Sequence, residues 1–511
     1  MKTNSSKAFV GKELLRLITT AMYDNALTVY REYVQNSVDA IDAAIEKGLS
    51  KKKAEVHIGI DHVERCITIR DNGAGVAAKM FARRMKAIGW SEKKGTTLRG
   101  IWGIGRLAGL AYCRHLVFRT KARGENTISR IDWDGQKFRE LLSAPNQNMD
   151  LSEIVEQIST ISSEKANARD PAFFEVQINQ VVRHGNDVLL NDAAVKDYLA
   201  QVAPVPFRDD APFGEEIKAF LMPHVDVSGY CIYMNEADEP IYKPHQKKFV
   251  YAKNRYDKFS VFDPVEIKGA SGKLSAVGWV LHHSYFGALK NSPLIRGIRV
   301  RSGNMQIGNE RILSGIFPEE RFNNWSVGEL HLLDPMLRPN GQRSNLEDTP
   351  AFRDIKNQLT PCVGRQVAKK CRDNSAARNK AHQRMEQLKG FEESLPILRA
   401  NILSPKKVAE ISAYIEQEAA ASRADGAAFP RAQREQIHAA ARRILKKLES
   451  ANKNSGKSAN LGHLSKARLD WLHDIADLVY QHAPNAKSRT ELLSRIRKHA
   501  ESKKVRLREK G

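Results

Sequence analysis

Hydrophobic residues in the first 200 positions repeat with two different periods. Over residues 14–22 and again over 27–41 they recur every three or four positions, which predicts helix, and Gly48 is placed to end the second one. Over 56–60 and 67–69 they alternate with polar residues, which predicts strands. Similar alternation predicts strands at 115–120, 127–133 and 173–179. Long helices mixed with short strands indicate an α+β fold with a largely antiparallel sheet.

Two changes of pattern divide the rest of the chain. The segment 202–212 is dense in proline, and the zone after it is strand-rich, with Gly303-Asn304 as a turn signal. From about residue 350 the spacing of apolar residues becomes helical. We therefore predict three parts: a first domain over 1–205, a second α+β domain over 206–350 and a helical region over 351–511.

Positive charge is concentrated in the predicted helical region. The 511-residue chain has a net charge of +23, and residues 351–511 carry 34 Lys and Arg against 17 Asp and Glu. The other 350 residues carry 48 basic against 42 acidic side chains. This asymmetry suggests an anionic partner, most simply nucleic acid. The alternative is a solvated helical bundle rich in Lys and Arg.

Neither a membrane anchor nor a disulfide framework is expected. No apolar run approaches the roughly 20 residues that span a bilayer, and the N-terminus lacks a secretory pattern. An odd number of cysteines without a CxxC pair argues against a zinc module, and a reducing cytoplasm fits best. These cysteines are Cys66, Cys113, Cys231, Cys362 and Cys371.

The first candidate motif is a polar stripe on the second predicted helix. Glu32, Asn36 and Asp39 are spaced i, i+4 and i+7, so they share one helix face. Acid, amide and acid in this order could serve a ligand. Taken alone, the stripe could equally be a solvated helix face.

The second motif, Asp71 with Gly73 and Gly75, comes directly after the strand predicted at 66–70. An acid and two glycines make a tight turn at which backbone can approach a ligand. Asp-Gly turns also end many strands that bind nothing. This motif alone therefore leaves both interpretations open.

The third motif is rich in glycine and leads into a helix-compatible stretch at 106–112. It contains Gly100, Gly103 and Gly105. Unpaired backbone N–H groups at the start of a helix can cradle phosphate. The P-loop pattern GxxxxGK[ST] is absent from the chain.

Together, in this order and spacing, the three motifs resemble those of the GHKL superfamily of ATPases. That superfamily includes gyrase B subunits, the ninety-kilodalton heat-shock chaperones, MutL-type and MORC-type proteins and sensor histidine kinases. The shared pattern is an E-x-x-x-N-x-x-D-A helix, a D-x-G-x-G turn and a glycine-rich lid. The resemblance covers residues 10–205 and extends more loosely to about 350. It implies a Bergerat-type α/β sandwich that binds ATP, followed by a transducer-like second domain.

The resemblance implies a role for each motif residue. Glu32 would be the base that activates water against the γ-phosphate, and Asn36 would ligate Mg²⁺ through its side-chain oxygen. Asp39 would support the ATP site, and Asp71 would accept a hydrogen bond from the adenine amino group. The glycines that would pass close to the base or wrap the phosphates are Gly73, Gly75, Gly100, Gly103 and Gly105.

Two further nucleotide contacts are less regular. Ser91 and Lys94 lie in a stretch similar to G-x-S-x-K of MORC-type and chaperone relatives, which implies contact with phosphate; a solvated loop is the alternative. The family usually has a Gly-Thr on a late strand near the base. The candidate strand 171–178 has none, and Thr120 is a poor substitute. The fourth nucleotide motif is therefore unassigned.

A loop in the second domain resembles the middle-domain loop of the heat-shock chaperones. In those proteins an arginine of this loop reaches the γ-phosphate. The resemblance implies Arg343 as a catalytic cation with Gln342 as a helper, carried by a strand over 325–333. An ordinary surface loop is the alternative.

Several GHKL subclasses fit poorly. A sensor kinase would need a dimerising helix with a phospho-acceptor histidine, for which there is no room before residue 32. A topoisomerase would need a cleavage domain larger than the helical tail. A MutL-type endonuclease would need a metal box, for which His473 and Asp477 at helical spacing are the candidates, with a solvated helix face as the alternative.

We therefore expect an ATP-hydrolysing clamp that dimerises when ATP binds and acts on, or is recruited to, nucleic acid in genome maintenance or defence against foreign DNA. One alternative is a chaperone-like ATPase with protein clients. Another is an ATP-switched regulator of a partner effector. The residues expected to contact nucleic acid are Arg442, Arg443, Lys446, Lys447, Lys503, Lys504, Arg506 and Arg508.

Overall fold

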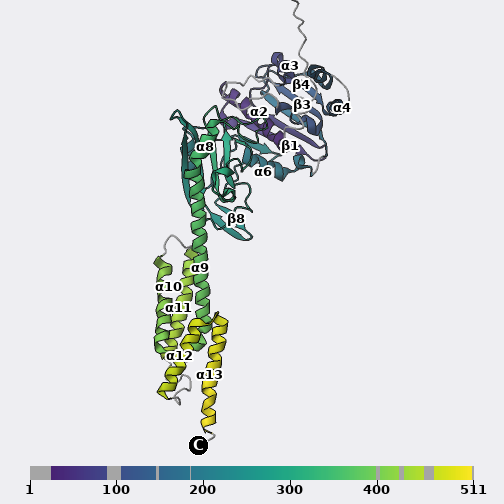
Figure 1. The fold of residues 1–511 in the computed structure, drawn as a ribbon. Helices are drawn as coiled ribbons and strands as arrows, with labels where there is room; N and C mark the ends of the chain where they lie inside the picture. The colour runs from purple at the N-terminus through teal and green to yellow at the C-terminus, as the bar shows by residue number, and fades with distance from the viewer. Residues whose placement is uncertain are drawn as a thin grey trace, which may run out of the picture. The chain divides into compact units, whose positions relative to one another are not determined.

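The chain divides into two compact units after Ala368 (Figure 1). The computed structural model describes residues 25–88, 105–144, 149–183, 186–398, 403–424, 431–453 and 465–508. The described residues of the first unit form a seven-stranded, a five-stranded and a two-stranded β-sheet with their helices, and the second unit is built from helices (Figure 1). None of the described helices combines the length and apolar composition needed to cross a bilayer.

A seven-stranded sheet with the order β5-β4-β3-β6-β2-β1-β7 organises the first part of the chain. All neighbouring strands are antiparallel except β1 and β7, which are parallel. Each strand that alternation predicts is present, so the α+β class and the largely antiparallel sheet are confirmed. The strands are β1 (Glu55–Asp61), β2 (Cys66–Asp71), β3 (Cys113–Lys121), β4 (Thr127–Asp134), β5 (Ser159–Lys165), β6 (Phe173–Val181) and β7 (Cys231–Met234).

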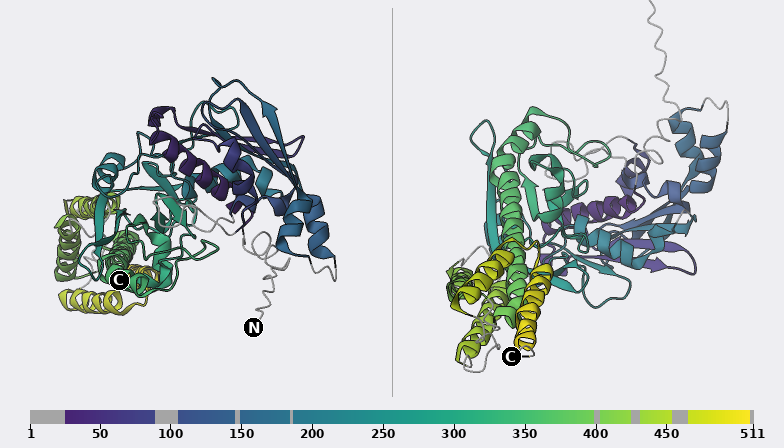
Figure 2. Two further views of the ribbon diagram at one scale, coloured as in Figure 1. Left: turned by 90° about the horizontal axis from the view of Figure 1, so that it is seen from above. Right: turned by 60° about the horizontal axis from the view of Figure 1, so that its bottom comes forward.

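Helix α2 (Thr28–Ile45) packs on β1, β2 and β6 and supplies the centre of the core (Figure 2). Its apolar side chains Tyr30, Val34, Val38 and Ile41 are all 0% exposed. Their helical spacing turns them toward the sheet, as the periodicity predicts. The other helices of the first unit are α3 (Ala78–Lys86), α4 (Gly135–Ser143), α5 (Leu151–Ile158), α6 (Asp192–Val202), α7 (Gly214–Leu221) and α8 (Pro350–Leu359).

A second sheet of five strands has the order β10-β11-β14-β12-β13. Gly303 and Asn304 join β12 to β13 with φ of 52° and 61°, the left-handed conformation that the turn signal predicts. The strand predicted at 325–333 is β14. The strands are β10 (Val261–Lys268), β11 (Leu274–His282), β12 (Gly297–Ser302), β13 (Met305–Ile307) and β14 (Val327–Leu332), beside a hairpin of β8 (Lys248–Ala252) and β9 (Arg255–Lys258).

The chain returns to the first sheet after the predicted boundary at residue 205. Strand β7 lies in the second predicted domain, yet it pairs with β1. Parallel pairing requires a long connection, and here it runs through β2 to β6 and helices α3 to α7. The domain boundaries at 205 and 350 stay predictions.

The second unit is a helical assembly with its own apolar core. Ile437, Ile444 and Leu448 of α11 are buried in it, as their spacing predicts. Tyr480 of α12 and Leu493 of α13 join the same core. Its helices are α10 (Pro405–Ala424), α11 (Arg431–Lys453), α12 (Lys466–His482) and α13 (Ala486–Arg508), with α9 (Arg365–Leu398) beginning just before the division.

Candidate functional site

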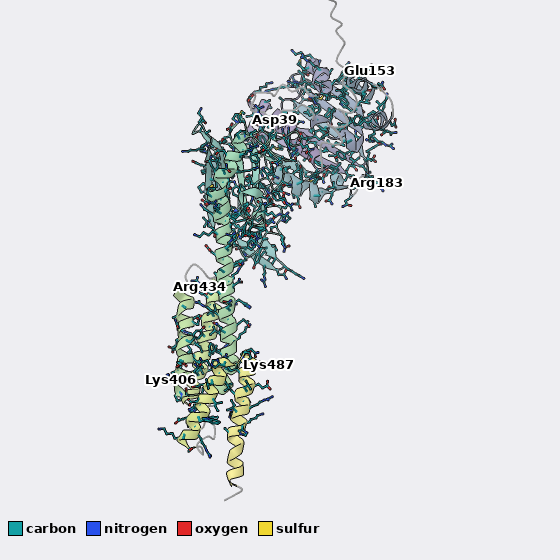
Figure 3. All side chains as sticks on the ribbon, in the orientation of Figure 1. Asp39, Glu153, Arg183, Lys406, Arg434 and Lys487 are labelled. Carbon is teal, nitrogen blue, oxygen red and sulfur yellow. The ribbon has the colours of Figure 1, made fainter. Side chains whose placement is uncertain are left out.

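The polar stripe of α2 is buried in the first unit rather than solvated. Glu32 is 4% exposed and Asp39, labelled in Figure 3, is 3% exposed. Asn36 is half-buried, and its side-chain amide makes no hydrogen bond with any described residue. Because both acids are buried, the alternative of a solvated helix face does not apply to Glu32 and Asp39.

Cationic and amide side chains surround the carboxylate of Glu32. Its Oε1 lies 3.2 Å from Nη2 of Arg31 and 3.4 Å from Nη1 of Arg343. The same Nη1 of Arg343 donates to Oε1 of Gln35. The structure thus brings Arg343, from the loop after β14, onto the helix that carries Glu32.

The loop that carries Arg343 is held together by a β-bridge and by hydrogen bonds to Asn340. Residues Pro339 and Leu346 form an isolated β-bridge, and Asn340 Oδ1 accepts the backbone N–H of Ser344 at 3.0 Å. Arg343 itself has φ of 54°, an unusual value for a residue with a side chain. Gln342 is exposed and accepts only a long contact from the Ser344 hydroxyl among the described residues, so it does not reach Glu32.

The carboxylate of Asp71 is fully enclosed at the end of β2. Its Oδ1 accepts the Gly73 N–H at 3.0 Å, whereas Oδ2 is buried without a hydrogen-bond partner among the described residues. Burial raises the pKa of Asp71 to about 7, although Ser37 and the Gly73 N–H lower it. An enclosed acceptor with a free oxygen is suited to a ligand that donates a hydrogen bond.

The turn after Asp71 packs closely against helix α2 on one side and the end of strand β3 on the other. The Ala74 N–H donates to the carbonyl of Ala40 on α2 at 3.0 Å, and a Cβ at Gly73 would lie 2.7 Å from the Ala40 carbonyl carbon. At Gly75, φ is +64° and a Cβ would lie 2.2 Å from the Lys121 carbonyl oxygen. Glycine is therefore required at both positions, because the neighbouring backbone lies too close to leave room for a Cβ atom.

The first part of the chain matches the family model described as histidine kinase-, DNA gyrase B- and HSP90-like ATPase, over residues 25–165. The matched segment contains Glu32, Asn36, Asp39 and the Asp71 turn, the polar residues described above. Residues 25–165 therefore form a domain of the GHKL ATPase type.

Several curated proteins that are similar to part of this chain are chaperones named HtpG. The protein from Photorhabdus laumondii is 28% identical over 155 residues, which is 26% of this chain and 25% of the relative. The protein from Coxiella burnetii is 30% identical over 142 residues, which is 24% of this chain and 22% of the relative. The protein from Escherichia coli K12 is 26% identical over 155 residues, which is 26% of this chain and 25% of the relative. The match thus spans about a quarter of each relative's length.

Strand β6 is the late strand that lacks a Gly-Thr pair. Phe174 of β6 stands opposite Asp71 in the sheet register, where no threonine is present. Thr120 on β3 is 0% exposed, donates to the Phe173 carbonyl at 2.8 Å and accepts the Val76 N–H at 3.0 Å. Its hydroxyl is thus occupied in fixing the turn after Asp71.

Not every residue of the predicted site can be placed. Ser91, Lys94, Gly100 and Gly103 lie outside the described residues. Gly105, the last glycine of the lid motif, begins the short helix η2 (Gly105–Leu107), and a Cβ there would lie 2.1 Å from Oε2 of Glu32. This glycine therefore lets the end of the motif touch the Glu32 carboxylate.

Sequence reasoning missed Gln35 and Arg31, which both contact the Glu32–Arg343 pair. Gln35 accepts from Arg343, and Arg31 lies beside Glu32. Both are buried, at 3% and 5% exposure. Gln35 is three residues after Glu32, so the helical spacing could have included it in the polar stripe.

In the second unit, the basic cluster on α11 is partly neutralised. Glu392 of α9 accepts from Arg443 at 2.7 Å and from Lys447 at 2.9 Å. Arg442 and Lys446 are exposed. The residues of the second predicted cluster, Lys503, Lys504, Arg506 and Arg508, belong to α13.

The acid of the predicted metal pair on α12 has a structural role. Asp477 accepts both the backbone N–H of Ser404, at 3.1 Å, and its hydroxyl, at the start of α10. No group of three or more metal-ligating side chains occurs among the residues that the structure describes. Asp477 therefore contributes to packing in the second unit.

Substitution of Gly75 by alanine is expected to destabilise the first unit by about 2–4 kcal/mol, because it combines a left-handed φ with overlap against Lys121. Gly124→Ala is the matched control, since Gly124 has φ of +79° and nothing within 4 Å of its Cβ position. That variant should lose only about 1 kcal/mol. Chemical unfolding measures both, and equal losses would contradict the close approach at Gly75.

Proposed function

We propose that the first unit binds ATP and hydrolyses it with Glu32 as the general base. The observation that carries this proposal is the buried Glu32 carboxylate held 3.4 Å from Arg343, with the half-buried Asn36 four residues further along the same helix. A buried carboxylate can orient and deprotonate a water molecule next to the γ-phosphate. Arg343 would neutralise the charge that develops during transfer, and Gln342 would assist from the same loop.

The described residues fit the nucleotide and its cation. Asp71 offers the adenine amino group a buried oxygen that has no other partner among them. The oxygen of Asn36 is a hard ligand suited to Mg²⁺, which would neutralise phosphate charge when bound. Asp39 would support this region from the same helix face. Phosphate contact is assigned to Ser91 and Lys94 and to the glycine-rich lid of Gly100, Gly103 and Gly105.

Adenosine affinity is expected to fall about tenfold between pH 8 and pH 6. The reason is that an ionised Asp71 is the better acceptor, and its pKa of about 7 leaves it mostly protonated at pH 6. Adenosine itself has no group that titrates in this interval, so titration by NMR reports on the protein. Affinity that is constant, or that rises toward pH 6, would contradict the assignment.

The second unit is proposed to couple this ATPase to nucleic acid, with the whole chain acting as a clamp that dimerises on ATP binding. Support comes from the net charge of the C-terminal region and from the exposed Arg442 and Lys446. Phosphate-backbone contacts of this kind are independent of sequence and weaken as salt rises. The three predicted domains would divide the work into nucleotide binding, transduction and nucleic-acid contact.

The test is ATP turnover by the full chain with and without double-stranded DNA, at two salt concentrations. Acceleration by DNA that is lost at high salt, and lost in Arg442→Gln/Lys446→Gln, supports the clamp. Lys389→Gln is the control, because Lys389 pairs locally with Glu386. Hydrolysis that ignores DNA in every variant would contradict the nucleic-acid role.

The similarity to HtpG supports a second candidate, an ATPase that acts on protein clients. In that case the helices of the second unit would hold clients or a partner copy. Suppression of the aggregation of a denatured test protein by the full chain, dependent on ATP, would favour this candidate. Absence of such suppression beside DNA-stimulated turnover would favour the clamp.

A further inference from the structure

Ionisable side chains are buried together at one face of the five-stranded sheet. Their exposed fractions lie between 1% and 3%. Burying several charges costs free energy unless each is paired in a defined geometry. Such a cluster can therefore hold the strands and helices that carry it at fixed positions. Its members are Lys243, Arg299, Arg301, Glu329 and His331.

Glu329 of β14 lies at the centre of this cluster. Its Oε1 accepts from Nζ of Lys243 at 2.8 Å and from Nε of Arg301 at 2.6 Å. Burial raises the pKa of Glu329, but the charges of Arg301 and Lys243 hold it well below its usual value. Glu329 is therefore an ionised anchor for Arg301.

The remaining nitrogens of Arg301 tie the second sheet to the first part of the chain. Nη1 donates to the Asn304 carbonyl in the β12–β13 turn at 3.0 Å, and Nη2 donates to the Gln201 carbonyl at 2.7 Å. Gln201 lies in the last turn of α6, where carbonyls lack partners within the helix. Each of the three acceptors is reached by a different nitrogen of the planar guanidinium, whereas a lysine would carry its three donors on a single nitrogen.

These contacts close a ring that begins and ends on α2. Helix α6 packs against both α2 and β13. Gly308, directly after β13, donates its N–H to the carbonyl of Arg343 at 2.8 Å. Arg343 then returns to α2 through Gln35 and Glu32. The ring thus runs from α2 through α6, Arg301 and the β12–β13 hairpin to the Arg343 loop.

We propose that Arg301 is a positioning residue that, through the β12–β13 hairpin, sets the distance between Arg343 and Glu32. This inference rests on the proposed role of Arg343 in hydrolysis. Arg301 lies inside the ring and touches neither Glu32 nor Arg343. It acts by fixing the hairpin to α6, and the hairpin fixes the loop through Gly308.

The test compares ATP turnover and ATP affinity of the full chain in Arg301→Lys, Arg343→Ala and the double variant. Arg301→Lys keeps the charge but cannot bridge three acceptors, so turnover at saturating ATP should fall about tenfold with little change in affinity. In the Arg343→Ala background it should cause no further loss, because the two residues act through one interaction. Hydrogen exchange at the Gly308 amide should speed up.

A second variant disrupts the ring of contacts at Gly308, a position outside the buried cluster of ionisable side chains. In Gly308→Ala the added Cβ would lie 2.3 Å from the Ser344 carbonyl oxygen, so the loop must shift, and this loss should likewise vanish in the Arg343→Ala background. Arg296→Lys is the control: Arg296 precedes β12 and pairs with Glu310 at 2.8 Å, outside the ring, and its turnover should be unchanged.

The possible results separate the two proposals. Losses from Arg301→Lys and Gly308→Ala that add fully to that of Arg343→Ala would show a merely structural role and overturn the inference. Unchanged turnover in both variants would also overturn it. If Arg343→Ala alone leaves turnover unchanged, the proposed catalytic role of Arg343 fails, and the positioning role fails with it.

Discussion

Glu32→Gln is expected to reduce ATP turnover by about 10²–10⁴-fold while ATP binding persists. Gln keeps the shape of the side chain and its amide oxygen can still accept from Arg343 and Arg31, so the buried space should remain filled. It cannot accept a proton from water at neutral pH. Single-turnover hydrolysis separates this loss from binding, which calorimetry measures on the same preparation.

The matched control for this variant is Glu46→Gln. Glu46 follows α2 directly and is exposed, so its neutralisation removes the same charge without touching the site. Turnover of this variant should equal that of the unmodified chain. Hydrolysis that survives Glu32→Gln would remove Glu32 from the mechanism, even if the GHKL fold is intact.

Asp71→Asn is expected to have opposite effects on stability and on binding. At pH 8 the folded protein without nucleotide should gain on the order of 1–3 kcal/mol, because the substitution removes a buried charge. ATP affinity should fall by about 10–100-fold, since the charged acceptor for the adenine amino group is lost. Thermal unfolding and calorimetric titration measure the two effects.

The sign of the stability effect follows from the pKa of Asp71. Burial raises it from 3.8 to about 7 in the folded chain, so ionisation costs more in the folded than in the unfolded state. In the unmodified chain, this ionisation lowers the free energy of unfolding progressively above pH 4, and the loss is complete above pH 7. The Asp71→Asn variant has no such group and shows no such loss. The stabilising effect of Asp71→Asn should therefore shrink as pH falls from 8 to 5.

Asp209→Asn is the control for this pair of measurements, because Asp209 is exposed. It should change neither stability nor affinity. A destabilised Asp71→Asn protein at pH 8 would mean that the free oxygen of Asp71 contributes to the fold itself. Such a result would contradict its assignment to a ligand.

Local chemistry determined much of the architecture of this chain. The repeat of Tyr30, Val34, Val38 and Ile41 is enough to predict α2, because a helix against a sheet needs one apolar face. The Gly303-Asn304 pair is enough to predict the β12–β13 turn, because few residues accept its left-handed backbone. The spacing of the short motifs was enough to indicate the superfamily. Within each of these signals, the residues lie only a few positions apart in the chain.

Burial of polar groups could not be predicted from the same pattern. A period of 3.6 residues shows that Glu32 and Asp39 share a face, but a solvated face and an enclosed site have the same period. Alternation likewise predicts that Arg299 and Arg301 lie on one side of β12, whereas only the structure shows that this side is buried. Residues from distant parts of the chain decide whether such a polar face is exposed to solvent or buried.

Contacts between distant residues belong to the tertiary structure alone. Arg343 meets Gln35 across 308 positions, and Arg301 reaches Gln201 across 100. Glu392 pairs with Arg443 and Lys447 in the same way, which involves two of the four basic residues predicted on α11 to contact nucleic acid. The sequence by itself determined the elements and the superfamily, because those depend on near neighbours. Which charges are paired, buried or left open was decided only when folding placed remote segments together.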